Sequence, residues 1–87
     1  MHITNPDLVA IKTAIRHLAS RVEAEVSEAE HWSSLAGNRG VGDVSATLDS
    51  VAETLRNAHA DLDAAARLLF DAQEQQSSQA HDHPHQH

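Results

Sequence analysis

All three glycines of this chain lie in one ten-residue stretch, Ser33-Ser34-Leu35-Ala36-Gly37-Asn38-Arg39-Gly40-Val41-Gly42. Glycine adopts left-handed backbone conformations without a steric penalty, and such conformations end helices and reverse the chain. A phosphate-binding loop would need a preceding strand or a Gly-Lys-Ser/Thr ending, and the stretch has neither. We therefore predict a turn over residues 35–42, in which the permissive positions are Gly37, Gly40 and Gly42.

The segment before this turn has a clear helix start and one apolar stripe. Asn5-Pro6-Asp7 combines an N-cap side chain, a proline at the first helical position and an acid favoured by the helix dipole. Apolar residues then recur at steps of three and four, as in an amphipathic helix, and they are Leu8, Ile11, Ile15, Leu18, Val22, Val26 and Ala29. We predict an N-terminal arm at residues 1–5 and a helix over residues 6–34.

The segment after the turn has the most regular apolar spacing in the chain. Its apolar residues alternate steps of three and four, and they are Val41, Val44, Leu48, Val51, Leu55, Ala58, Leu62, Ala65, Leu69 and Ala72. This spacing predicts a helix over residues 43–76 that offers a continuous seam to a facing helix, with coiled-coil-like packing. The alanines in its second half predict either the tightest packing there or a shallow groove for a partner.

Together these segments predict an all-α fold, an antiparallel two-helix hairpin over residues 6–76. A chain of 87 residues has room for one small domain, and so small a core is marginally stable alone. Two arms cover each other's stripes only in part, so we expect pairing with a second hairpin, identical or different, into a four-helix bundle. Off-seam residues left to be buried are Val9, Leu35, Leu68 and Phe70. The predicted partner interface comprises Leu48, Val51, Leu55, Leu62, Leu68 and Leu69.

The composition argues against several classes of function. Asp and Glu number 13 against 6 Lys and Arg, and the resulting net charge of -7 disfavours binding to nucleic acid. The chain has no Cys, which excludes disulfides, thiolate metal sites and cysteine nucleophiles. No apolar run is long enough for a membrane span, and the N-terminus lacks a signal-peptide pattern. A two-helix rod offers no cleft for a nucleophile and its base, so we predict that the protein is not an enzyme.

Residues 77–87 form a polar tail that we predict to be disordered, because almost nothing apolar offsets the entropy of ordering it. The tail has four histidines at alternating positions, His81, His83, His85 and His87. Imidazoles at this spacing could bind one Zn²⁺, Ni²⁺ or Cu²⁺ ion. The alternative is a tail that only adds solubility, and elsewhere in the chain we expect no cofactor.

The chain has one Trp, one Phe and no Tyr. Trp32, at the end of the first arm, is predicted to close the hairpin by packing over the turn onto the start of the second helix. Phe70 falls one residue beyond the seam and faces outward, with Glu74 one turn later on the same side. This aromatic-acid pair predicts either a recognition signal or a peripheral contact with a second subunit.

These features together resemble the small helical-hairpin substrates of type VII (ESX) secretion, over residues 3–76. The chain looks most similar to the ESX secretion-associated proteins of the EspC type, whose opening resembles Ile3-Thr4-Asn5-Pro6-Asp7-Leu8, and more distantly to the Trp-x-Gly (ESAT-like) superfamily. The Trp-x-Gly turn is not intact here, because two serines follow Trp32. The Tyr-x-x-x-Asp/Glu export signal of such proteins is matched by Phe70-Asp71-Ala72-Gln73-Glu74, with Phe in place of Tyr.

The resemblance implies a non-enzymatic protein that folds in the cytoplasm, pairs with a similar hairpin and presents its C-terminal segment to the secretion machinery. Phe70 and Glu74 would then form the export signal, and the protein would be secreted or located at the cell surface. Two other functions stay open. One is a structural or adaptor coiled-coil protein, for example in phage or cell-envelope assembly, and without export the chain would stay cytoplasmic. The other is a metal-binding protein in which the hairpin displays the histidine tail.

Overall fold

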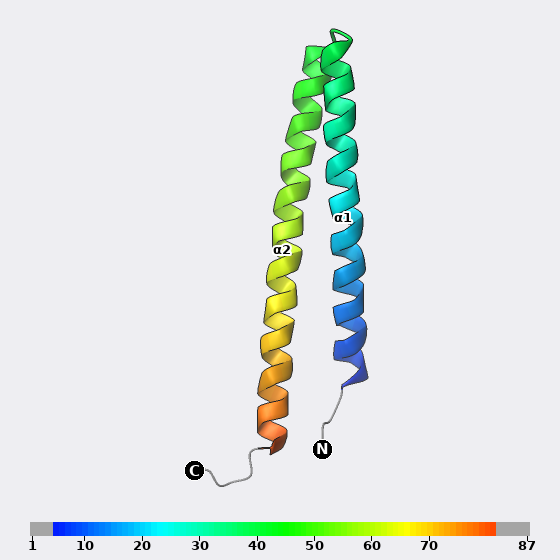
Figure 1. Ribbon diagram of the computed structural model, residues 1–87. Coiled ribbons are helices and arrows are strands. Elements are labelled where there is room, and N and C mark those ends of the chain that lie inside the picture. The colour runs from blue at the N-terminus through cyan, green and yellow to red at the C-terminus, as the bar shows by residue number, and fades with distance from the viewer. Residues whose placement is uncertain (1–4, 82–87) are drawn as a thin grey trace.

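The computed structural model describes the backbone of residues 5–81 and the side chains of residues 5–75. It consists of two helices, α1 over Pro6–Asn38 and α2 over Gly42–His81, which lie side by side and antiparallel (Figure 1). No strand occurs in this described part of the chain. The prediction of an all-α, antiparallel two-helix hairpin is therefore confirmed. Over the same residues, neither helix is long and apolar enough to cross a membrane.

The start of α1 is the one predicted from the sequence. The side chain of Asn5 accepts hydrogen bonds from the backbone N–H groups of Asp7 and Leu8, at 2.9 and 3.4 Å, and Pro6 is the first helical residue. These bonds satisfy two of the N–H groups that a helix start leaves without an intrahelical partner. Asp7 adds a negative charge near the positive end of the helix dipole. The cap and the proline together define where the chain enters α1.

The turn is shorter than predicted and lies later in the chain. α1 continues through Asn38, beyond its predicted end at residue 34, so only residues 39–41 are non-helical. The backbone N–H of Gly40 donates to the carbonyl oxygen of Gly37 at 3.2 Å, and that of Val41 donates to the carbonyl oxygen of Ala36 at 3.0 Å. This pair of bonds is the Schellman arrangement, which needs a left-handed residue after the helix end. Gly40 supplies it with a φ of 83°.

The other two glycines of the predicted turn are helical. Gly37 lies in the last turn of α1 and Gly42 begins α2, and neither has a positive φ. A Cβ atom on Gly37 would lie 3.4 Å from Oγ of Ser45, so the missing side chain lets the two helices approach. The prediction of a turn over residues 35–42 is therefore wrong, because a helix tolerates a glycine at a modest cost when packing favours it.

α2 is longer than the predicted helix over residues 43–76, because it begins at Gly42 and ends at His81. Residues 77–81, which we predicted to begin the tail, therefore have a helical backbone. Glutamine and alanine favour helices, and no helix-breaking residue occurs before Pro84. The predicted metal ligands fall outside the described side chains, since His81 has only its backbone described and the others lie in residues 82–87. Residues 1–4 of the predicted N-terminal arm also lie outside the described residues.

The helices approach most closely near the turn, where the facing residues are small. The buried residues of the described part are Ala29, Ser33, Ala36 and Ala52. From the turn towards the two termini the ribbons separate (Figure 1). The tightest packing is thus not at the alanines in the second half of α2, as one of our two alternatives predicted, and the half-buried residues there include Ala58, Ala65 and Ala72.

A buried hydroxyl sets the register of the helices near the turn. Oγ of Ser33 lies 3.0 Å from both the carbonyl oxygen and Oγ of Ser45, and 2.5 Å from Oδ1 of Asp49. The hydroxyl has one proton to donate, and the short contact to a carboxylate favours Asp49 as its acceptor. Ser33 is 4% exposed, so a slip of one helix along the other would leave a buried polar group unsatisfied.

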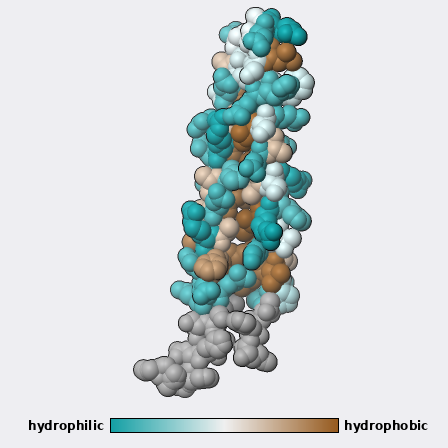
Figure 2. Space-filling model, in the orientation of Figure 1, coloured by the Kyte–Doolittle hydropathy of each residue, from teal (hydrophilic) through white to brown (hydrophobic). Residues whose placement is uncertain are grey.

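The hairpin has a line of contact rather than an enclosed core. Among the described side chains, no large one is fully buried. On the face seen in Figure 2, hydrophilic side chains cover most of both helices, and hydrophobic atoms appear chiefly in the strip between them. Half-buried apolar residues along this strip hold the two helices together, which is consistent with a marginally stable isolated domain.

We predict that Gly40→Ala lowers the free energy of unfolding by about 1 kcal/mol, because alanine would have to adopt the left-handed conformation. Gly42→Ala is the matched control and should leave stability unchanged or raise it, since a Cβ atom there meets nothing within 4 Å. Urea denaturation followed by far-UV circular dichroism measures both variants. An equal loss in the two variants would contradict this helix end.

Candidate partner interface

α2 carries a row of leucines with a different kind of residue on each flank. In helices packed as in a coiled coil, residues seven apart lie on the same side. The leucine row is half-buried and comprises Leu48, Leu55, Leu62 and Leu69. One flank of this row is polar or small and comprises Ser45, Ala52, His59, Ala66 and Gln73. The other flank is entirely apolar and comprises Val44, Val51, Ala58, Ala65 and Ala72.

The polar or small flank of α2 is the one that faces α1. Ser45 is bonded to α1, Ala52 is 1% exposed, and His59 lines a hollow between the two helices. The apolar flank is turned away from this contact, and its two valines, Val44 and Val51, are about half exposed. The seam predicted for α2 therefore has the correct leucines but the wrong flank.

α1 is arranged in the same way. Its central row is buried or half-buried and comprises Leu8, Ile15, Val22, Ala29 and Ala36. The flank that faces α2 comprises Ala19, Val26 and Ser33. The other flank comprises Ile11, Leu18, Glu25 and Trp32. Ile11 and Leu18, which we expected on the stripe facing the second helix, are 47% and 45% exposed because they belong to this outer flank.

An ion pair shows that the two outer flanks lie on the same side of the hairpin. Arg56 of α2 contacts Glu30 of α1, so both residues lie on one side. On each helix, this residue lies just beyond the inward-facing flank, away from the outer flank. The two outer flanks therefore share the opposite side. We call that side the apolar face, and it comprises Ile11, Leu18, Trp32, Val44, Val51, Ala58, Ala65 and Ala72.

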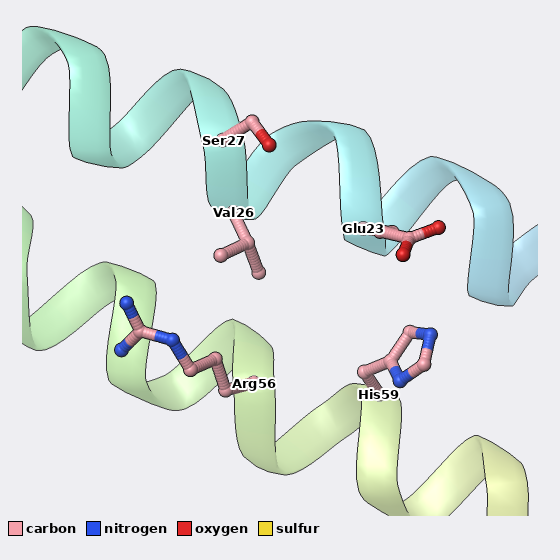
Figure 3. Close-up of a pocket in the computed structure, with 5 residues that line it drawn as sticks. All are labelled: Glu23, Val26, Ser27, Arg56 and His59. Carbon is pink, nitrogen blue, oxygen red and sulfur yellow. The ribbon is translucent and has the colours of Figure 1, made fainter.

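The opposite side, which we call the ion-pair face, holds the charged contacts between the helices. The hydrogen bond to Glu30 raises the pKa of Arg56, which keeps this guanidinium charged. Nδ1 of His59 lies 3.6 Å from Oδ2 of Asp63. Figure 3 shows Glu23 of α1 across the hollow from His59. Exposed pairs of this kind contribute little stability, so their role is to favour one rotation of the helices.

Phe70 also lies on the ion-pair face. It is 59% exposed and lines a shallow hollow whose other residues are Lys12, Arg16, Ala66, Leu69 and Gln73. The ring therefore leans towards α1, whereas we expected it to face outward. Glu74 is exposed one turn later and does not line this hollow. The candidate export signal is accessible, but the immediate neighbours of its aromatic ring include two cationic side chains from α1.

The predicted interface residues divide into three groups. The four leucines of the leucine row stabilise the hairpin itself. Val51 belongs to the apolar face. Leu68 is 70% exposed but lies outside the leucine row and both of its flanks, next to the edge of the apolar face. The residues that the sequence analysis missed are Glu30, Arg56 and His59, because cross-helix pairing becomes visible only when the rotation of both helices is known.

Trp32 does not close the hairpin. Because α1 continues to Asn38, the tryptophan lies about two helical turns before the reversal of the chain. Its indole is 49% exposed and meets the ring of His31 edge-on, with ring centroids 4.8 Å apart and an interplanar angle of 71°. The largest side chain of the molecule is therefore part of the apolar face.

We predict that acrylamide quenches the fluorescence of Trp32 in a dilute sample of the chain to an extent between that of a buried indole and that of the urea-unfolded chain. Trp32 is the only tryptophan, so the signal reports on this one position of the apolar face. The unfolded chain provides the fully exposed reference. Quenching as weak as that of an enclosed indole would contradict the position of Trp32.

No three His, Asp or Glu side chains among the described residues are placed to hold a metal ion. Comparisons of this chain with protein-family models, with curated proteins and with solved structures found no significant match. A functional conclusion therefore depends on the geometry of the two faces: an apolar one that the hairpin does not cover, and a charged one that presents Phe70.

Proposed function

We propose that this chain is a non-enzymatic interaction module whose apolar face pairs with a second helical hairpin to complete a four-helix bundle. The observation that carries the proposal is the exposure of five large apolar side chains on one side of the rod, each between 42% and 50%: Ile11, Leu18, Trp32, Val44 and Val51. Contiguous exposed apolar surface of this kind marks interaction sites. Pairing would supply the burial that the isolated hairpin lacks.

The shape of the apolar face favours a helical partner. Between Val44 and Ala72 it runs for about 40 Å along α2, at 1.5 Å per residue. Its residues recur in rows seven apart, which offer knobs and holes to helices that run along it. The alanines of its second half would let a partner backbone approach closely, in agreement with a shallow groove. A second hairpin with the same repeat fits this surface along its whole length.

We further propose that the paired hairpin is exported through a type VII secretion system, as the resemblance described above implies. Phe70 and Glu74 would be the export signal, recognised by the ring and the carboxylate without a phenol hydroxyl. The exposure of Phe70 supports this role, and so does its position on the ion-pair face. Pairing through the apolar face would leave the signal accessible, so the protein could be recognised as a folded pair and released outside the cell or at its surface.

An adaptor protein that is not exported would use the same apolar face. In that case Phe70 would be an exposed residue with no recognition role. The two functions therefore differ in what substitution of Phe70 does, and they agree on what contacts the apolar face. A metal-binding function would depend on histidines outside the described side chains and would need neither face.

We predict that a photoreactive phenylalanine analogue at position 51 cross-links the chain, in its cell of origin, to one small helical protein. Val51 lies on the apolar face, so the analogue would be covered by the partner. The same replacement at Glu53 is the control, because Glu53 is exposed on the other side of α2. Mass spectrometry identifies the product. No product from position 51, or equal products from both positions, would contradict pairing through this face.

We predict that Phe70→Ala abolishes secretion in a strain with a working type VII system, whereas Phe70→Tyr preserves it. Leu68→Ala is the matched control, since it removes a more exposed apolar side chain two residues away and should not affect secretion. Immunoblots of the medium and the cells measure secretion, and circular dichroism verifies that helicity is retained. Wild-type secretion of both Phe70→Ala and Glu74→Ala would exclude these residues as the export signal.

A further inference from the structure

One charged residue lies within the apolar face. Glu25 is seven residues from both Leu18 and Trp32, so it shares their row on the outer flank of α1. The residues next to it on the inner side, Val22 and Ala29, are half-buried and buried. Within residues 5–75, Glu25 forms no salt bridge. A partner that covers the apolar face therefore removes this carboxylate from water.

A carboxylate that loses its water needs a cation or several hydrogen-bond donors in exchange. Arg21 lies one turn before Glu25, in the row beyond the outer flank, and makes no salt bridge to it in the described part of the structure. An arginine that precedes a glutamate by four residues is also the less favourable order for a pair within a helix. The compensating charge must therefore come from the partner.

A second copy of this chain does not supply that charge. Glu25 is three residues from residue 22, the midpoint of α1, so two copies that overlap fully along a two-fold axis bring their Glu25 residues to nearly the same height. Lys12, Arg16 and Arg56 lie on the ion-pair face. Arg39 is in the turn, about 20 Å along α1 from Glu25. Two chains of net charge -7 also repel each other.

We propose that the apolar face binds a different chain, a helical partner that places a Lys or Arg opposite Glu25. This inference rests on the proposed pairing and identifies the chemistry of the partner. Glu25 determines specificity in two ways. It weakens association between copies of the chain, because two carboxylates would be buried together, and it favours a partner with a basic residue at that height.

A charge-reversed copy tests the proposal with the full chain as its own probe. Sedimentation equilibrium at neutral pH compares wild type, Glu25→Leu, Glu25→Lys and an equimolar mixture of wild type with Glu25→Lys. Glu25→Leu should dimerise at least about 100-fold more tightly than wild type, because no charge is then buried. The mixture should form a heterodimer at least about tenfold tighter than the dimer of either component alone.

Glu23→Lys is the matched control, since it makes the same charge change two residues away on the ion-pair face. Its mixture with wild type should not show the tighter association. A wild-type dimer as tight as that of Glu25→Leu would overturn this inference and leave pairing intact, with a second copy as the occupant. Equal gains from Glu23→Lys and Glu25→Lys would overturn the role of Glu25, because net charge would then account for them. No association in any sample, Glu25→Leu included, would overturn the pairing itself.

Discussion

The apolar arc on each helix is wider than one neighbouring helix can cover, and the rest of the structure depends on this mismatch. A helix in a hairpin contacts its neighbour through two adjacent rows of a seven-residue repeat. In α2 the leucine row is joined by a polar or small flank on one side and by an apolar flank on the other. Only one flank can face α1. The hairpin turns the polar or small flank inward, and the apolar flank is left on its surface.

Polar contacts decide which flank faces inward. Ser33 bonds to Ser45 and Asp49 near the turn, and Glu30 contacts Arg56 further along the rod. The opposite rotation of the helices would break these contacts and place the apolar flanks inside. It would also leave no side of the rod for a partner to cover. The same contacts keep Phe70 on the ion-pair face, so pairing and recognition would use separate surfaces and would not compete.

Much of the fold followed from local signals, and the candidate site followed only in part. The Asn5 cap and the three-and-four spacing correctly predicted two helices in a hairpin. The flank that faces inward could not be predicted, because the step from Leu48 to Val51 and the step from Leu48 to Ala52 both fit a heptad repeat. The length of the turn was missed because Gly37 serves a close helix contact. The metal-binding role of the tail stays a prediction, since its histidine side chains lie outside the described part.

The described hairpin encloses no large side chain, and this affects how long the chain would survive in a cell. A domain held together by half-buried contacts opens locally at little cost, and proteases cut the opened form. A partner that binds only the closed form suppresses opening by mass action. Surplus chain without its partner would be degraded first, so turnover alone would keep the two proteins at matching levels, even if they were synthesised in unequal amounts.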